Sequence, residues 1–269
     1  MGPVEELVEA IVTGLGLNFG PFSVKGPVMV LILVRLITMP RFGSFDQRNY
    51  ETVPAREGYA QWAETYEETI KHDMDVWLLQ ELQSVDWNAV RHCADLGCGT
   101  GRSAAWLASR GVAVIDGVDA TPEMLNRARE RQVFSSLYLA DVCATGLPAA
   151  TYDLVMTCLV DEHLADLTPL YAEAARISQN GAAYVLVGFH PFFIMVTGMP
   201  THFKAAHGRP VAIETHVHLL SDHVTAALAA GWRLTELREQ VINDRWVKTK
   251  PSWAAYRDVP ISFASVWRR

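Results

Sequence analysis

The stretch CADLGCGTGRSAAWLASRG, residues 93–111, decides the fold of this chain. It places Gly97, Gly99 and Gly101 within five residues, directly after an apolar run and directly before a helix-like segment. Glycine adopts positive φ readily and lets a backbone approach a ligand closely. In a parallel sheet, the turn that leaves the first strand is where nucleotides bind. The stretch therefore predicts a strand, a ligand-binding turn and a helix.

This turn does not fit a dinucleotide. A dinucleotide fold needs the pattern Gly-x-Gly-x-x-Gly, with the pyrophosphate at the helix N-terminus, and Arg102 occupies the place of the third glycine. Asp95 lies just before the turn, where its carboxylate would repel a pyrophosphate. Together these two residues favour a cationic ligand.

Strand and helix patterns alternate along most of the chain. Near-continuous apolar strands separated by helices indicate a parallel sheet that is covered on both faces. We expect an α/β fold: a Rossmann-like, doubly wound, mostly parallel seven-stranded sheet with an N-terminal helical cap and an insertion after the fifth strand. The later strands are expected at VAVIDGVDA (112–120), SLYLADV (136–142), YDLVMTCLV (152–160), AAYVLVGF (182–189), RLTELREQVI (233–242) and ISFASVW (261–267). Helices are expected at 59–83, 102–110, 121–132, 163–178 and 221–232, the last with a Ser221 cap.

Composition divides the chain near residue 50. Residues 1–50 form an apolar extension, expected to be helical and to serve packing or an interface, and residues 51–269 form the main domain. The run 26–40 is too short to span a bilayer, which takes about 20 apolar residues, and it contains Arg35. We expect a packed helix there, while membrane contact through 26–40 stays an open alternative. Monomer and homodimer both stay open.

Net charge and cysteine spacing indicate which classes of partner and which cellular compartment to expect. With 23 basic and 30 acidic residues the net charge is −7, so we expect no nucleic acid partner, because such binding relies on clustered Lys and Arg. The cysteines lack metal-type spacing and indicate free thiols in a reducing cytoplasm. His216 and His218 alternate along an extended segment, but no third ligand has suitable spacing, so we expect no metal. The cysteines are Cys93, Cys98, Cys143 and Cys158.

Several motifs together resemble the class I S-adenosylmethionine (SAM)-dependent methyltransferases, of the small-molecule, type 11-like kind. ADLGCGTG (94–101) looks like their first motif and GVDATPEML (117–125) like their second. YDLVMTCLVDEHLADL (152–167) resembles the fourth-strand segment, and WAETYE (62–67) the N-terminal helix motif. The resemblance covers about residues 56–269 and implies SAM as cofactor, with S-adenosylhomocysteine as product.

The resemblance also implies roles for single residues. Asp119 would accept both ribose hydroxyls, Asp141 would accept the adenine amino group, and Tyr66 would close over the methionine end. The full implied cofactor-binding set is Tyr66, Asp95, Gly97, Cys98, Gly99, Gly101, Asp119, Ala120, Met124, Asp141, Val142 and Leu159.

Methyl transfer from a sulfonium is an in-line displacement, so the protein mainly supplies orientation and excludes water. A general base is needed only where the acceptor arrives protonated. His163 and His190 follow the fourth and fifth strands and are the expected catalytic pair. Two plainer interpretations stay open: His163 as a residue of the first turn of the next helix, and His190 as the start of a loop.

The insertion at about 190–219 is expected to act as a substrate lid without regular periodicity. Its apolar residues indicate a small-molecule substrate with a hydrophobic part, or else they bury the insertion itself. A SAM-binding protein that does not methylate (regulatory or cyclase-like) and an enzyme acting on a lipid or quinone at a membrane surface are the alternatives. The expected pocket residues are Trp62, Phe192, Phe193, Met199, His202 and Phe203.

Overall fold

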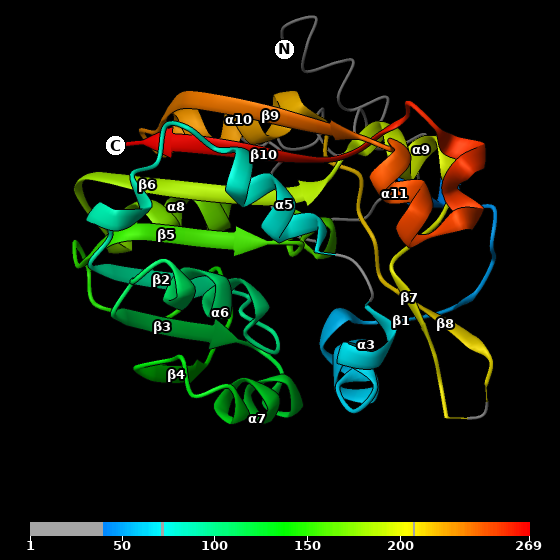
Figure 1. The fold of residues 1–269 in the computed structure, drawn as a ribbon, viewed down its shortest axis with the longest axis horizontal. Helices are drawn as coiled ribbons and strands as arrows, with labels where there is room; N and C mark the ends of the chain where they lie inside the picture. Colours follow the sequence, from blue (N-terminus) through cyan, green and yellow to red (C-terminus); the bar gives the residue numbers. More distant parts are fainter. Residues whose placement is uncertain (1–39, 71–72, 207) are drawn as a thin grey trace, which may run out of the picture. The chain divides into compact units, whose positions relative to one another are not determined.

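A computed structural model describes residues 40–70, 73–206 and 208–269. Its main feature is a seven-stranded sheet in the order β4-β3-β2-β5-β6-β10-β9 (Figure 1). The five strands from β4 to β6 are parallel, whereas β10 is antiparallel to both β6 and β9. The strands are β2 (His92–Leu96), β3 (Val114–Asp119), β4 (Ser136–Leu139), β5 (Tyr152–Cys158), β6 (Ser178–Phe189), β9 (Arg233–Val241) and β10 (Pro260–Arg268). The predicted fold class is confirmed.

Helices cover both faces of this sheet. Leu170 and Tyr171 of α8 (Thr168–Ile177) pack with α10 (Leu220–Ala229) on one face. Leu78 of α5 (Met74–Glu81) and Leu107 of α6 (Arg102–Ser109) belong to a second core on the other face. Neighbouring strand residues alternate between the two cores, as Ala183 and Tyr184 do on β6, because successive side chains of a strand point to opposite faces. Also present are α7 (Pro122–Glu130), α9 (Pro191–Thr197), α11 (Asp244–Thr249), η1 (Phe42–Ser44), η2 (Trp87–Ala89), η3 (Asp161–His163) and η4 (Pro251–Tyr256).

The prediction of a single long helix over 59–83 is wrong. The segment contains α3 (Ala55–Trp62), α4 (Tyr66–Thr69) and α5, with a turn after α3 and extended backbone at Ile70. The Thr69 hydroxyl lies 2.8 Å from the Trp62 indole nitrogen, which donates to it, and 3.0 Å from the Thr65 carbonyl. Threonine hydroxyls that bond nearby backbone compete with helix continuation. The apolar spacing is the same in one helix and in three, so the pattern alone missed the break.

Smaller boundaries also differ from expectation. The helix expected from 163 begins at Thr168, because residues 161–163 form the short turn η3 instead. The strand expected over 136–142 ends at Leu139. Ser221 does not cap α10: the N-cap is Leu219, whose backbone nitrogen donates to the Asp222 carboxylate at 2.9 Å.

The insertion has regular structure of its own. Its strands β7 (His202–Lys204) and β8 (Pro210–Ile213) are antiparallel, and β1 (Glu51–Val53) runs parallel to β8 in a second, three-stranded sheet. Trp62 of α3 and Phe203 of β7 stack there with ring centroids 5.6 Å apart. Figure 1 shows α3 and this small sheet beyond the carboxyl ends of β2, β3 and β5. The insertion and the N-terminal helix therefore lie at the edge where the first motif ends.

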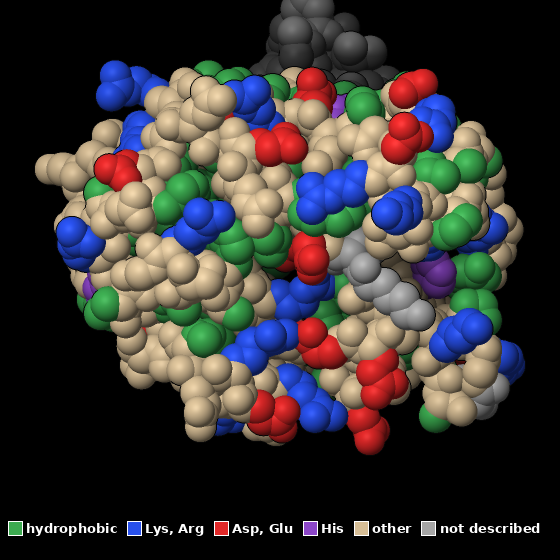
Figure 2. All heavy atoms as spheres, viewed as in Figure 1, with side chains coloured by type: hydrophobic (Ala, Val, Ile, Leu, Met, Phe, Trp, Pro, Cys, Tyr) green, Lys and Arg blue, Asp and Glu red, His purple; other side chains and the backbone are tan. Residues whose placement is uncertain are grey.

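Residues 1–39 lie outside the part of the chain that is described. The packed helix or membrane contact expected for 26–40, and most of the extension expected over 1–50, therefore stay predictions. Among the described residues, no helix is long and apolar enough to cross a membrane. Figure 2 shows acidic and basic side chains mixed along the middle of one face. The four cysteines are free.

Candidate functional site

The glycine turn has the backbone that its sequence predicts. Gly97, Gly99 and Gly101 have φ of +73°, +53° and +85°, values in the left-handed region that glycine adopts without steric cost. A Cβ on Gly97 would overlap the Val160 side chain, whereas a Cβ on Gly99 would meet nothing within 4 Å. The turn is therefore packed tightly at its start and open at its middle, where a ligand has room.

Asp95, at the end of β2, has one unused oxygen. The side chain is fully buried; Oδ2 accepts a hydrogen bond from Ser103 at 2.9 Å, and Oδ1 has no partner. Burial raises the pKa of this carboxyl to about 7. A buried polar atom without a partner is costly, and a cationic or hydrogen-bond-donating ligand at the turn would satisfy it.

Asp119 ties the second strand to the glycine turn. Its Oδ2 accepts from the Gly99 backbone N–H at 2.9 Å, and its Oδ1 accepts from that of Thr121 at 2.8 Å. Burial raises the pKa of Asp119, and the two backbone donors counter this effect. Each carboxylate oxygen keeps a further lone pair for a ligand.

Asp141 lies at the end of the neighbouring strand. The Ala140 N–H donates to the Asp119 carbonyl at 3.1 Å, which brings the two strand ends together. Asp141 is exposed, and its Oδ1 accepts from the Cys143 N–H at 2.7 Å. Among the other implied cofactor residues, Ala120 is exposed, whereas Cys98, Met124 and Val142 are buried.

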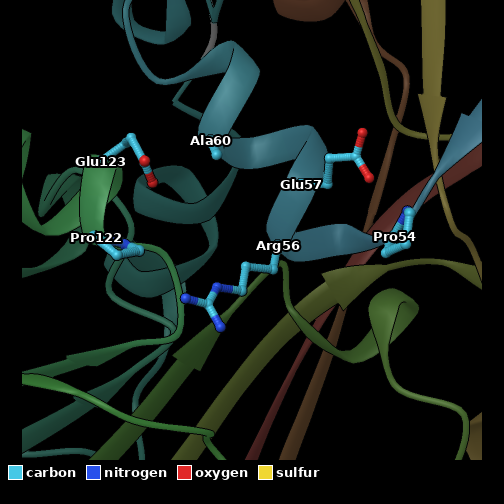
Figure 3. A pocket seen from close by; sticks show the side chains of 6 residues that line it. All are labelled: Pro54, Arg56, Glu57, Ala60, Pro122 and Glu123. Atoms are coloured by element: carbon cyan, nitrogen blue, oxygen red, sulfur yellow. The ribbon is translucent and has the colours of Figure 1, made fainter.

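A cavity opens beside these strand ends. It has a volume of about 380 Å³ and lies between the start of α3 and the start of α7 (Figure 3). Pro122 and Glu123 line it on the α7 side, shortly after Asp119 in the chain, and Arg56 and Ala60 line it on the α3 side. The remaining lining residues are Pro54 and Glu57. The cavity adjoins the second-motif strand end and does not include either candidate histidine.

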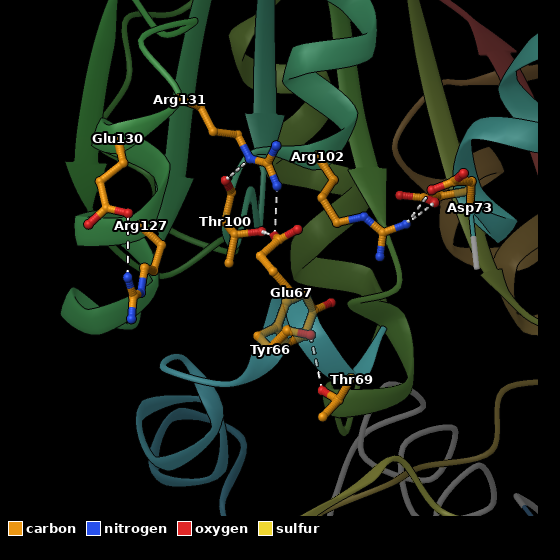
Figure 4. Close-up of polar contacts among 10 residues, drawn as sticks. Tyr66, Glu67, Thr69, Asp73, Thr100, Arg102, Arg127, Glu130 and Arg131 are labelled. Atoms are coloured by element: carbon orange, nitrogen blue, oxygen red, sulfur yellow. Dashed lines mark hydrogen bonds and ion pairs between the residues drawn. The ribbon is translucent and has the colours of Figure 1, made fainter. Parts of the chain in front are cut away.

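Helix α4 is fastened across the glycine turn (Figure 4). The Thr100 hydroxyl donates to the Glu67 carboxylate, Arg131 pairs with the same carboxylate at 2.7 Å, and Arg131 Nε donates to the Thr100 carbonyl at 2.6 Å. Partial burial raises the pKa of Glu67, but the hydrogen bonds from Thr100 and Arg131 lower it more, so the pKa lies below its usual value. Arg102 contacts Asp73 at 3.1 Å on the segment that follows α4.

Sequence reasoning missed Glu67 and Arg131. Glu67 stands next to Tyr66 in the motif WAETYE, so attention to the charged residue beside that tyrosine would have found it. Tyr66 itself packs edge-on against Trp62, with ring centroids 4.9 Å apart. Leu159, after β5, has φ of +58°, a strained value for a branched side chain of the kind that clusters at functional sites.

His163 lies in a buried hydrogen-bonded chain. Its Nε2 is 2.9 Å from the Tyr59 hydroxyl, and its Nδ1 is 2.8 Å from the Glu214 carbonyl. Burial lowers the pKa of His163 to about 4, so the ring is neutral at physiological pH. Tyr59 is a third residue that sequence reasoning missed, although it lies three residues before Trp62 on α3.

His190 has a different environment. It is the N-cap of α9: its Nδ1 accepts from the Phe192 N–H at 3.1 Å, and its Nε2 lies 2.8 Å from Glu239. His163 bonds to Tyr59 and Glu214 whereas His190 bonds to Phe192 and Glu239, so the two expected bases belong to separate networks in the described structure. This arrangement favours a capping role for His190.

The expected pocket residues separate into two groups. Trp62 and Phe203 are buried together in the core of the small sheet, while Phe193 and Met199 pack into a cluster with Trp253. Phe192 is exposed. His202 lies near Tyr50, with ring centroids 5.4 Å apart, and its Nδ1 is 2.9 Å from the Pro200 carbonyl.

Two buried carboxyls precede His163. Asp161 Oδ2 lies 3.5 Å from His223 Nε2, and Glu162 Oε1 lies 3.6 Å from His163 Nε2. Burial and the neighbouring Asp161 raise the pKa of Glu162 to about 8. Within the described ranges, no group of three or more His, Cys, Asp or Glu side chains is arranged to hold a metal ion, His216 and His218 included.

Comparisons with known proteins agree with this architecture. Residues 94–186 match the family model described as a methyltransferase domain. A malonyl-[acyl-carrier protein] O-methyltransferase from Serratia marcescens is 36% identical over 87 residues, which are 32% of this chain and 34% of that relative. The match thus spans about a third of that relative's length.

Two further similarities extend over more of the chain. An uncharacterized methyltransferase from Emericella nidulans is 24% identical over 250 residues, 76% of this chain and 87% of that protein. The crystal structure of an S-adenosylmethionine dependent methyltransferase from Mesorhizobium loti has a TM-score of 0.57 at 22% identity and covers 72% of this chain and 96% of its own. The structural similarity thus covers a larger share of the chain than the segment that the family model matches.

Proposed function

We propose that this chain is a class I S-adenosylmethionine-dependent methyltransferase and that it transfers the methyl group of this cofactor to an oxygen or nitrogen of a small molecule. The observation that carries the proposal is the glycine turn with the buried, unpartnered Oδ1 of Asp95 beside it. That oxygen suits a ligand with a cationic end, and the open space at Gly99 leaves room for it. The free cysteines fit the cytoplasm in which we expect the enzyme.

The chain's residues would hold the cofactor from three sides. Asp95 would face the methionine end, Asp119 the ribose, and Asp141 the adenine, in the order of the strand ends β2, β3 and β4. When bound, SAM supplies a methyl group on a sulfonium, which is already activated for displacement. Glu67 and Arg131 would keep α4 closed over the turn and exclude water from the reacting atoms.

His163 is the proposed base for an acceptor that arrives protonated. It follows the strand β5, whose end lies at the same edge of the sheet as the glycine turn. A neutral imidazole buried at such an edge can receive a proton, and general bases of this kind contribute roughly 10²–10⁴-fold to rate.

The test of this function is calorimetric titration followed by an acceptor screen. We expect the protein to bind SAM and S-adenosylhomocysteine and to leave NADH unbound. Release of S-adenosylhomocysteine is then measured against hydroxyl, carboxyl and amine acceptors. Binding of both sulfur compounds without turnover of any acceptor would instead favour a SAM-binding protein that does not methylate, and absence of binding by folded protein would overturn the proposal.

A further inference from the structure

We propose that the Tyr59 hydroxyl is the catalytic group that takes the proton from the methyl acceptor, and that His163 is the buried base behind it. This inference rests on the proposed function and deepens it. It starts from the two hydrogen bonds of the His163 ring, 2.9 Å to Tyr59 Oη and 2.8 Å to the Glu214 carbonyl. Together these contacts use both nitrogens of the ring.

The partners fix where the ring hydrogen lies. A carbonyl oxygen only accepts, so Nδ1 of His163 must donate to Glu214. A neutral imidazole has one N–H, so Nε2 carries the lone pair and accepts the hydrogen of the Tyr59 hydroxyl. Burial lowers the pKa of His163 to about 4, which keeps the ring in this neutral form.

His163 therefore has no nitrogen to offer to a substrate. Its side chain is only 5% exposed, and both nitrogens are occupied. The Tyr59 oxygen, by contrast, donates its hydrogen inward and keeps its lone pairs for an incoming proton. A proton that reaches Nε2 must pass through this hydroxyl unless the contact is broken.

Tyr59 lies close to His163, which follows β5, and to Tyr66 of α4. Its ring is 6.3 Å from that of Tyr66 and 6.0 Å from that of Trp62, between ring centroids. Tyr66 directly precedes Glu67, which is bonded to Thr100 of the glycine turn. Burial raises the pKa of Tyr59, and Tyr66, Glu162 and Asp119 add to this effect. The hydroxyl is therefore suited to pass a proton on and unsuited to ionise.

The proton transfer balances within the chain. The bond from the acceptor atom to its hydrogen breaks and an O–H bond forms at Tyr59, while the original Tyr59 proton moves to His163 Nε2. The acceptor keeps the electron pair for methyl transfer. The resulting imidazolium has Glu162 Oε1 3.6 Å from Nε2 and the Glu214 carbonyl at Nδ1, and the side chains of Asp161 and His216 also lie close enough to act on its charge. After product release the proton returns to solvent by the same path.

The first test reads the His163 ring directly, without cofactor or acceptor. Nitrogen-15 NMR of histidine-labelled protein, with the signal assigned by its loss in His163→Gln, should show the neutral form protonated at Nδ1 from pH 6 to 8. In Tyr59→Phe the His163 pKa should rise, because the hydroxyl that stabilises the neutral ring is gone. A ring protonated at Nε2, or a pKa unchanged in Tyr59→Phe, would overturn the relay.

The second test compares two acceptor probes of like size, a phenol and a thiophenol, with SAM. The thiophenol reacts as a thiolate and needs no base, whereas the phenol does. We expect Tyr59→Phe to lower kcat on the phenol by about 100-fold or more and on the thiophenol by less than about three-fold. Tyr138→Phe, an exposed tyrosine on β4, is the matched control and should change neither.

Failure of the relay and failure of the proposed function give different results. Equal losses on both probes in a folded Tyr59→Phe variant that still binds SAM would make Tyr59 structural and overturn the relay alone. If the wild-type protein binds SAM but methylates neither probe nor any screened acceptor, the proposed function fails and the relay fails with it.

Discussion

The proposed cofactor edge, at the ends of β2, β3 and β4, and the proposed acceptor side, around His163, are built in different ways. At the cofactor edge, from β2 to β4, the contacts of Asp95 and Asp119 come from residues within about twenty positions along the chain. On the acceptor side, His163 bonds to Tyr59, 104 residues before it, and to Glu214, 51 residues after it. The edge from β2 to β4 is a local motif. The contacts of His163 form only once the insertion and the N-terminal helix have folded onto the sheet. Changes at the cofactor edge should therefore alter SAM binding, and changes on the acceptor side should alter turnover.

Substitution within the glycine turn should have the largest effect. In Gly97→Ala the new methyl group overlaps Val160 at a φ of +73°, so strain and overpacking together should lower the free energy of unfolding by roughly 2–5 kcal/mol. Gly111→Ala is the matched control: φ is +89° there, but a Cβ meets nothing within 4 Å, so only the backbone cost of about 1–2 kcal/mol should appear.

Gly99→Ala separates folding from binding in the same series. Its Cβ also meets nothing within 4 Å at a φ of +53°, so its loss of stability should match that of Gly111→Ala. Only Gly99→Ala should weaken SAM binding, because its methyl group enters the space proposed for the ligand. Urea denaturation and calorimetry measure the two effects, and equal SAM affinity in both variants would contradict the proposed position of the cofactor.

The buried His163 should give stability a pH dependence of known sign. Its pKa is about 4 in the folded protein and about 6.5 in an unfolded chain. Between these values the unfolded chain binds the extra proton, so His163 makes stability fall as pH falls from 6.5 to 4, by about 3 kcal/mol in total. Glu162, with its pKa raised to about 8, acts with the opposite sign between its unfolded value and pH 8.

Because His163 and Glu162 change stability with pH in opposite directions, the histidine contribution is measured as the difference between wild type and a His163 variant. Urea denaturation of wild type and of His163→Gln at intervals from pH 4.5 to 7.5 isolates the histidine contribution. As the pH is lowered, we expect the free energy of unfolding to fall less in His163→Gln than in wild type. Parallel curves for the two proteins would mean that His163 titrates normally and is not the buried neutral base.

The sequence predicted the backbone of the glycine turn better than the surroundings of His163 for this same reason. The three glycines and the aspartates at the ends of β2 and β3 lie within a few residues of the elements that position them, so motif spacing was enough. At the breaks after Trp62 and at Ile70, the Thr69 hydroxyl bonds to the Trp62 indole and to the Thr65 carbonyl. Apolar periodicity carries no information about such polar contacts. The pairing of β1 with β8 joins residues 160 positions apart, as Glu51 and Val211 show, and no local pattern encodes such a contact.

Asp119→Ala and His163→Gln test the division between the two regions directly. Removing Asp119 deletes a charged acceptor proposed for the ribose, worth roughly 1–3 kcal/mol, so SAM affinity should fall about 5- to 150-fold. His163→Gln should leave SAM affinity within about two-fold and lower turnover of a hydroxyl acceptor. Calorimetry and release of S-adenosylhomocysteine measure the two outcomes. Loss of SAM binding in both variants would break the comparison, because the two regions would then act as one site.

The smallest expected effect concerns the contact that fastens α4 to the glycine turn. Glu67→Gln weakens the ion pair with Arg131 at 2.7 Å, which is partly exposed, and pairs of this kind contribute roughly 0–1 kcal/mol. SAM affinity should therefore fall by no more than about five-fold, and less so at high salt, because ions screen the pair. Glu130→Gln is the matched control, since its partner Arg127 lies on α7 at 3.5 Å and neither residue contacts the turn (Figure 4). A reduced affinity in Glu67→Gln alone would show that α4 contributes to cofactor binding by closing over the turn, whereas equal affinities would leave the local motif as the whole of the cofactor site.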